Sequence, residues 1–220
     1  MSDRPLNADW FARSTLVVAR ELVGCRLVRE SPDGIRVGRI VETEGYTQDD
    51  PAFHGWNAID HATGLLKPTG RGRDLFVAPG LAYVYKIYGT YWLLNVVTEP
   101  PGIGGGVLIR AIEPVDGLDL MYRDRPNATR DRDLGSGPGK LTQALDIGPE
   151  FHGSDLTRPP LYFLPPDRPV SEIEITTRIG LTRGIELDYR YLEAGNPHVS
   201  PGVPSDIAAV RRRKKKGVPR

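Results

Sequence analysis

Short apolar runs separated by turn residues dominate the chain, and this pattern is typical of an antiparallel sheet. Residues 25–30 and 35–44 form two such runs, and the Ser-Pro-Asp-Gly stretch between them predicts a hairpin. Residues 81–97 predict a second hairpin, and residues 107–114 predict a further strand. Residues 172–200 predict two or three more strands with polar turns, and we expect little independent chemistry from them.

Helical patterns are fewer and shorter. Residues 15–23 predict a helix that ends at Gly24, with Ser14 placed to cap its start. Residues 116–123 and 140–145 predict two more short helices.

Length and composition limit the class of protein. A chain of 220 residues fits one domain or at most two small ones. Its 39% hydrophobic and 26% charged residues are typical of a globular protein with a true core. There is no apolar run of membrane-spanning length and no signal peptide at the start, so we expect a cytoplasmic protein. The single cysteine, Cys25, cannot form an internal disulfide and is expected in the core.

The charge is unevenly distributed. The net charge is +1, but the last ten residues hold seven basic side chains and leave 22 basic against 28 acidic residues elsewhere. A uniformly basic nucleic-acid binder is therefore excluded. We expect a domain over residues 1–205 and a flexible basic tail over residues 206–220, which either contacts phosphates or only aids solubility.

The strongest candidate for chemistry is the stretch of residues 39–54. The expected strand leads into Glu42 and Glu44, with Tyr46 directly after it and His54 eight residues further on. A carboxylate can orient or deprotonate water, an aromatic ring offers a flat face to a planar substrate, and an imidazole can donate or accept a hydrogen bond. Because both glutamates share one face of a regular strand, periodicity does not choose between them unless a bulge separates them.

A long segment with many glycines and prolines follows, over residues 49–80. It carries the cations Lys67, Arg71 and Arg73, the last two beside glycines that allow close backbone approach. These residues suit contact with phosphate, and a solvated flexible loop is an equally good interpretation.

Aromatic residues cluster in the second hairpin. Tyr88 falls at its turn, next to Gly89 and Thr90, where a large ring is exposed. An exposed ring there could stack on bases or enter a duplex as a wedge. Tyr83 and Tyr85 share a face of the strand and, taken singly, fit ordinary core residues of a sheet better than ligand contacts.

Three polar residues stand in unusual places. Asn95 lies within an apolar run, so its amide either bridges parts of the protein or forms hydrogen bonds with the polar edge of a ligand. Arg110 lies in an apolar strand and needs an anionic partner. Lys140 follows Gly-Pro-Gly at a helix start. This segment is either an anion-binding site or an ordinary turn into the helix.

Several common chemistries have no signal in the sequence. There is no cluster of cysteines and histidines for zinc, no Gly-X-Ser-X-Gly turn and no dinucleotide-binding glycine motif in the right frame. We therefore expect neither a metal nor a cofactor.

Seven strings together carry a resemblance to a known family. They are RIVETEGY, DPAFH, YVYKIYGTYWLLNVV, VLIRAIEP, SGPGKLTQAL, RIGL and GNPHVS. In this order the chain resembles the alkyladenine (3-methyladenine) DNA glycosylases, monofunctional enzymes of purine base excision. The resemblance implies an α+β fold, a single domain with a curved, mostly antiparallel sheet flanked by short helices.

The resemblance also implies roles for individual residues. Glu44 matches the general base that deprotonates the attacking water. Tyr46 and Tyr85 match the walls that stack on the flipped base, and His54 matches a donor beside it. Tyr88 matches the residue that wedges into the duplex. Two further residues follow the same pattern, Asn95 as the rim residue that excludes guanine and Arg110 as a holder of the water or of an adjacent phosphate.

Two features depart from the family pattern. A stretch of residues 55–69, Gly55–Thr69, stands before the Gly-Arg-Gly-Arg segment and includes a second histidine, His61. Thr90 stands beside the wedge, where a bulkier apolar residue is usual, and is expected to contact DNA.

The expected activity is hydrolysis of the N-glycosidic bond of a damaged purine in double-stranded DNA by a monomer. No lysine lies beside Glu44 in sequence, which favours hydrolysis without strand cleavage. Two other functions stay open. One is a glycoside or nucleoside hydrolase that uses Glu42 and Glu44 as a carboxylate pair. The other is a nucleic-acid-binding module without catalysis.

Overall fold

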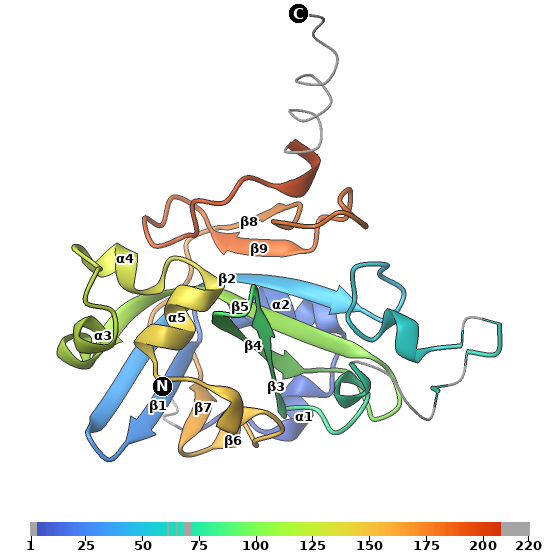
Figure 1. The fold of residues 1–220 in the computed structure, drawn as a ribbon, viewed down its shortest axis with the longest axis horizontal. Helices are drawn as coiled ribbons and strands as arrows, with labels where there is room; N and C mark the ends of the chain where they lie inside the picture. Colours follow the sequence, from blue (N-terminus) through green and yellow to red (C-terminus); the bar gives the residue numbers. More distant parts are fainter. Residues whose placement is uncertain (1–3, 61, 65, 68–71, 208–220) are drawn as a thin grey trace, which may run out of the picture.

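A nine-stranded sheet organises the molecule (Figure 1). The computed structural model describes residues 4–207 except 61, 65 and 68–71. Seven strands follow the order β3-β4-β5-β2-β1-β7-β6, and β9 pairs with both β2 and β8. The strands are β1 (Arg26–Ser31), β2 (Gly34–Thr47), β3 (Ala82–Ile87), β4 (Tyr91–Val97), β5 (Gly105–Asp116), β6 (Thr157–Arg158), β7 (Leu161–Leu164), β8 (Ile173–Thr176) and β9 (Arg190–Glu193).

All the ladders between these strands are antiparallel, and the two predicted hairpins are present as β1–β2 and β3–β4. Together with the short helices, they confirm the expected α+β fold with a curved antiparallel sheet. Strands β6 and β7 did not stand out in the sequence, because they are two and four residues long.

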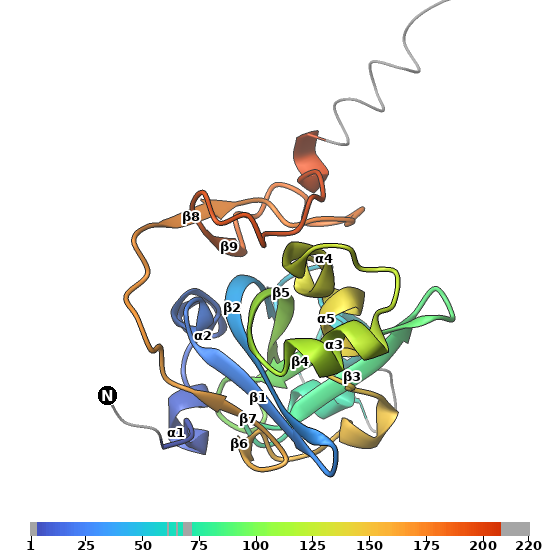
Figure 2. The same cartoon turned by 90° about the vertical axis from the view of Figure 1, so that its left-hand side faces the viewer.

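Strand β2 is the longest and connects the two parts of the sheet. One edge pairs with β5 along most of its length. The other edge pairs first with β1 and then, over Glu42–Glu44, with β9. Figure 2 shows β8 and β9 together at one end of the molecule, joined to β7 by a long connection over residues 165–172. The C-terminal strands therefore complete the sheet beside the two glutamates.

Alternation along the strands gives the two faces of the sheet different roles. Val84, Leu94, Val96 and Ile109 point into the main core, which the helix α2 (Thr15–Leu22) covers beside β2 and β5. The residues between them point to the opposite face, which carries the candidate site. The remaining helices are α1 (Ala8–Phe11), α3 (Leu118–Asp124), α4 (Asp131–Gly135) and α5 (Pro138–Ala144).

The helix predicted over residues 15–23 is confirmed as α2, and Gly24 after it has φ +95°. Ser14 occupies the N-cap position but makes no capping hydrogen bond with its side chain. Instead, the carboxylate of Glu99 accepts a hydrogen bond from the backbone N–H of Thr15 at 2.6 Å. A distant acid therefore replaces the cap that the local sequence suggested, and its negative charge suits the positive end of the helix dipole.

The described residues of the long segment over residues 49–80 include regular structure that the sequence did not suggest. It contains two single-turn 3₁₀ helices, Trp56–Ala58 and Arg73–Leu75. Ala58 and Ile59 are buried in a second, smaller core with Phe53, Leu75, Phe76, Tyr83 and Val97. The first part of the unusual 55–69 stretch therefore packs beneath the site. None of the helices in the described residues is long and apolar enough to cross a membrane.

Candidate active site

Four strands contribute one continuous row of side chains to the open face of the sheet. Glu44 of β2 pairs with Leu108 of β5, Leu108 pairs with Asn95 of β4, and Asn95 pairs with Tyr83 of β3. Neighbouring strands lie about 4.8 Å apart, so the row spans about 14 Å. It lines a cavity of about 1020 Å³, a volume at the upper end of the range for small-molecule sites.

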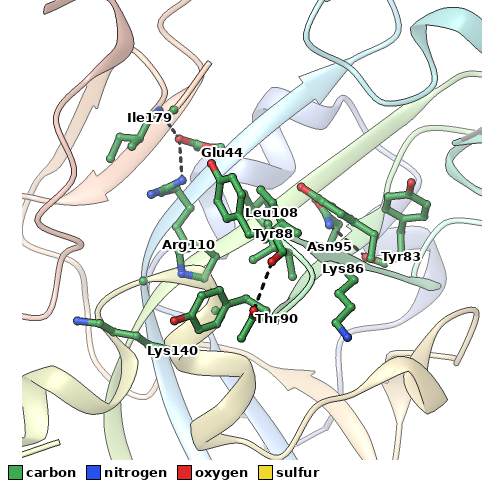
Figure 3. Close-up of a pocket in the computed structure, with 18 of the residues that line it drawn as sticks. Glu44, Tyr83, Lys86, Tyr88, Thr90, Asn95, Leu108, Arg110, Lys140 and Ile179 are labelled. Carbon is green, nitrogen blue, oxygen red and sulfur yellow. Dashed lines mark hydrogen bonds and ion pairs between the residues drawn. The ribbon is translucent and has the colours of Figure 1, made fainter. Parts of the chain in front are cut away.

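Glu44 lies at the inner end of this row and is fully shielded from bulk solvent. Its Oε1 accepts a hydrogen bond from the backbone N–H of Ile179 at 2.8 Å and lies 3.3 Å from Nη1 of Arg110. Its Oε2 accepts one from the hydroxyl of Tyr46 at 2.8 Å. Figure 3 shows the carboxylate turned toward Ile179 and Arg110. Since a carboxylate oxygen can accept two hydrogen bonds, Oε2 keeps a position for a water molecule.

Arg110 joins the two glutamates that the sequence left equivalent. Its Nε donates to Oε1 of Glu42 at 3.0 Å, while Nη1 faces Glu44. Burial would lower the pKa of Arg110, but the charges of Glu44 and Glu42 outweigh that effect and raise the pKa above its ordinary value. Arg110 is therefore a permanent cation with two anionic partners, which are the partners its position in an apolar strand required.

A bulge separates the two glutamates. The β2–β5 register shifts between Ile40 and Glu42 and again between Glu42 and Thr43. Glu44 lines the cavity, whereas Glu42 is fully buried and does not line it. The two carboxylates are thus not presented together to a substrate, which argues against a glycosidase that uses both of them.

Aromatic rings form the walls of the cavity. Tyr46 is half-buried, and the guanidinium carbon of Arg178 lies 4.5 Å from the centre of its ring. Burial raises the pKa of Tyr46 well above its ordinary value, and the negative charge of Glu44 adds to this shift. The phenol therefore stays protonated and keeps donating to Glu44. Across the cavity, the ring of His54 lies 4.3 Å from that of Tyr85 and edge-on to it.

His54 and Asn95 are fixed by the same tyrosine. Nδ1 of His54 lies 3.3 Å from the hydroxyl of Tyr83, and Nδ2 of Asn95 donates to the carbonyl oxygen of Tyr83 at 3.1 Å. Both side chains also line the cavity. The structural and the ligand-facing interpretations of Asn95 are therefore compatible, because the side chain bonds to Tyr83 and also lines the cavity.

The outer edge of the cavity carries the exposed hairpin turn. Tyr88 is 86% exposed and has a positive φ of 53°, and the hydroxyl of Thr90 donates to its carbonyl oxygen at 3.3 Å. Lys140 also lines the cavity, and its Nζ donates to Ser136 at 3.2 Å. The prediction that an aromatic ring occupies the exposed tip is confirmed.

Of the predicted phosphate contacts in the glycine-rich segment, the described ones do not line the cavity. Arg73 is described and does not line it, while Arg71 lies outside the described residues, as do His61 and most of the basic tail. Gly72 between the two arginines has φ +82°, and a Cβ there would lie 2.7 Å from the carbonyl of His54. This glycine therefore serves the close packing of two backbone segments.

The C-terminal third contributes to the site in a way that the sequence did not indicate. Ile179 donates to Glu44, and Arg178 forms a buried ion pair with Asp50 beneath Tyr46. Arg190 and Ser200 both contact Glu42. The region was expected to offer little independent chemistry, and its contribution is to hold the two glutamates of β2.

A second missed residue is Arg125, which lines the outer part of the cavity. It contacts the side chain of Gln143, and its Nε is buried without a partner. Within the described chain no carboxylate lies within ion-pair distance of it. In the same residues, no group of three metal-ligating side chains is found.

Comparisons with known proteins show the family of this chain. The model of the methylpurine-DNA glycosylase (MPG) family matches residues 9–197. A relative from Salinibacter ruber is 52% identical over 91% of this chain and 98% of its own length. Relatives from Rubrobacter xylanophilus and Carboxydothermus hydrogenoformans are 47% and 42% identical, over 80% and 89% of this chain and 86% and 98% of their own lengths. All three carry the provisional name 3-methyladenine DNA glycosylase. The chain belongs to the methylpurine-DNA glycosylase family.

Proposed function

We propose that this protein is a DNA glycosylase that removes alkylated or deaminated purines from double-stranded DNA and leaves an abasic site. The observation that carries the proposal is the position of Glu44, a carboxylate at the inner end of a cavity walled by Tyr46, Tyr85 and His54. The glycosidic bond of a base inside a duplex is covered, so the nucleotide has to rotate out to reach this carboxylate.

Rotation of the nucleotide leaves a gap in the duplex. Tyr88, exposed at the tip of the β3–β4 hairpin, is placed at the mouth of the same cavity and would fill that gap. Thr90 and Lys140 would contact the DNA around it. Unstacking costs a few kcal/mol and costs less for a damaged or mismatched base, which supplies part of the selectivity.

Inside the cavity the base would stack between Tyr46 and the Tyr85–His54 pair. Alkylated purines carry positive charge, and cations are attracted to the faces of electron-rich phenol rings. Asn95, held by Tyr83, would read the polar edge of the base and reject the exocyclic amine of guanine.

Hydrolysis would then need one water molecule at the free position of Glu44 Oε2. The water oxygen forms a bond to the sugar carbon, the bond from that carbon to the purine nitrogen breaks, and its electron pair leaves with the base. Glu44 takes the proton of the water and stabilises the positive charge that develops on the sugar. General-base catalysis of this type contributes roughly 100- to 10,000-fold.

No Schiff base is included in this mechanism. Of the lysines lining the cavity, Lys140 donates to Ser136 and Lys86 lies over the ring of Trp92, and neither is a partner of Glu44. Borohydride should therefore fail to trap the protein on damaged DNA, and a trapped adduct would contradict the hydrolytic mechanism.

The decisive experiment compares Glu44→Gln with the parent protein on duplexes that each contain one hypoxanthine, 7-methylguanine or ethenoadenine. The parent should release a base from at least one duplex. The variant should bind the same duplex with unchanged affinity and lose base release by roughly 100-fold or more. A protein that binds these duplexes and releases nothing would be a binding module, and faster release from free nucleosides would indicate a nucleoside hydrolase.

A further inference from the structure

Glu42 is a fully buried carboxylate that the proposed reaction does not use. Its Oε1 accepts hydrogen bonds from Nε of Arg110 at 3.0 Å, Nε of Arg190 at 2.6 Å and the hydroxyl of Ser200 at 2.9 Å. Its Oε2 accepts one from the backbone N–H of Ser200 at 2.7 Å. These four donors come from β5, from β9 and from the chain after β9.

The contacts of Glu42 determine the orientation of Arg110. Nε of Arg110 donates to Glu42, Nη1 faces Glu44, and Nη2 donates to the hydroxyl of Ser200 at 3.4 Å. All three nitrogens of the guanidinium are therefore held, and only Nη1 points to Glu44, the candidate general base. A planar guanidinium group with all three nitrogens held cannot turn away from Glu44 without breaking a buried contact.

The same contacts attach the C-terminal part of the chain to the site. Arg190 and Ser200 contact Glu42 at one end of this part, and Ile179 donates its N–H to Glu44 at the other. Two carboxylates, Glu42 and Glu44, thus face two guanidiniums, those of Arg110 and Arg190. Because the four charges balance, they can be buried together.

We propose that Glu42 is a positioning residue, which holds Arg110 against Glu44 and fastens residues 178–200 over the inner end of the cavity. The proposal rests on the function proposed above for Glu44. Residues that orient a reacting group from behind commonly change activity by about 10- to 100-fold when they are removed.

The test uses Glu42→Gln, with Glu193→Gln as its matched control. Glu193 is also a buried glutamate of the sheet paired with an arginine, Arg39, but it touches neither Arg110 nor Glu44. Single-turnover base release is measured on the lesion that the parent removes fastest, together with the affinity for a duplex with an abasic site. The release rate and the affinity are both measured under conditions in which every variant is folded.

We expect Glu42→Gln to slow base release about 10- to 100-fold with abasic-site affinity within about threefold of the parent. The pH profile of base release should differ from that of the parent, because a buried charge beside Arg110 has been removed. Amide hydrogen exchange over residues 178–200 should also accelerate. Glu193→Gln should keep the release rate within about threefold and keep the pH profile of the parent.

A milder variant keeps the test valid if Glu42→Gln does not fold. Ser200→Ala removes the hydroxyl that bridges Glu42 and Arg110 and keeps both charges. We expect release to slow about 3- to 10-fold, with the affinity for abasic DNA unchanged.

Three results would overturn the inference. One is a Glu42→Gln variant, or a Ser200→Ala variant where the former is unfolded, with the parent's rate and pH profile. Another is a loss of release that Glu193→Gln matches, since that would make Glu42 merely structural. A parent that releases no base from any lesion duplex would remove the proposed function itself, and the positioning role with it. The first two results leave the proposed function intact, so the two failures are distinguishable.

Discussion

The two ends of the cavity are built in opposite ways. At the inner end, Glu44 is fully buried, and its neighbours Arg110 and Tyr46 are held by hydrogen bonds and ion pairs. At the outer end, Tyr88 is 86% exposed at a hairpin turn, and Lys140 donates to the hydroxyl of Ser136. On the proposed mechanism, rigid groups place a reacting water, whereas an uncovered ring can enter a duplex. Substitutions at the two ends should therefore change different quantities.

The largest effect is expected for Arg110→Met. The change leaves Glu42 and Glu44 buried with one cation fewer, and breaking a buried ion pair in this way costs about 3–5 kcal/mol. Urea unfolding measures the loss in the free energy of unfolding. Arg123→Met is the control, because its ion pairs lie on the exposed surface and should cost less than about 1 kcal/mol. Equal losses in the two variants would remove the contrast between a buried and an exposed charge.

Tyr88→Ser should weaken binding without weakening the fold. A ring that stacks on bases contributes about 1–3 kcal/mol to affinity, while an exposed tip contributes little to stability. The measurement is the affinity for a duplex with an abasic site, alongside the free energy of unfolding. Ile175→Ser, which removes another exposed apolar side chain, should leave the affinity unchanged. Unaltered affinity in Tyr88→Ser would count against a wedge.

Tyr46→Phe tests the two roles of Tyr46 separately. Its ring forms a wall of the cavity, and its hydroxyl supports the carboxylate of Glu44. The ring remains and stacking is kept, but Glu44 loses the hydrogen bond to its Oε2. A hydrogen bond to a charged group is worth enough to slow base release roughly 10-fold. Single-turnover rates and lesion affinity, measured together, should show a slower rate at equal affinity. A change in affinity alone would indicate that the hydroxyl binds the purine base.

Alkaline pH should destabilise the inner end. Burial and the nearby charge of Glu44 raise the pKa of Tyr46, so the folded protein keeps a proton that the unfolded chain loses at about pH 10. The free energy of unfolding should therefore fall above that pH, by up to about 1.4 kcal/mol per pH unit from this group. Urea unfolding between pH 8 and about 11 should give a shallower decline for Tyr46→Phe than for the parent. Identical slopes would mean that the phenol ionises freely in the fold.

The smallest effect is expected at the outer wall, for Arg125→Gln. Arg125 has a buried Nε without a partner and lines the cavity, so we expect it to contact one DNA phosphate. When the logarithm of the binding constant is plotted against the logarithm of the salt concentration, loss of one such contact should make the slope less steep by about one unit. Arg123→Gln, on the same side of the fold but paired with Asp33 and Asp124, should leave the slope unchanged. An unchanged slope in Arg125→Gln would exclude the contact.

The local parts of the site could be predicted from the sequence. The turn at Tyr88-Gly89-Thr90 follows from a break between two β-branched and aromatic runs, and the structure places it between β3 and β4. Glu44, Tyr46 and Asn95 follow from polar or aromatic residues at alternating strand positions, because alternation fixes which face a side chain occupies. All three line the cavity, as does His54.

The long-range parts could not be predicted in this way. Glu42 and Glu44 were equivalent by periodicity, and only the folded chain separated them, because Arg190 and Ser200 contact Glu42 while Glu44 lines the cavity. The partners of Glu42 come from residues more than 60 positions away, and no local pattern identifies them. The same holds for Glu99, which replaced Ser14 as the partner of the α2 N-terminus.

The sequence by itself determined the strands, their turns and the side chains on each face, because these depend on residues only a few positions apart. It also determined the family, through ordered strings that extend over most of the chain. Tertiary structure alone decided which glutamate meets the cavity and which cations neutralise the pair. These outcomes depend on burial, and a buried charge is stable only where the folded chain brings a partner to it.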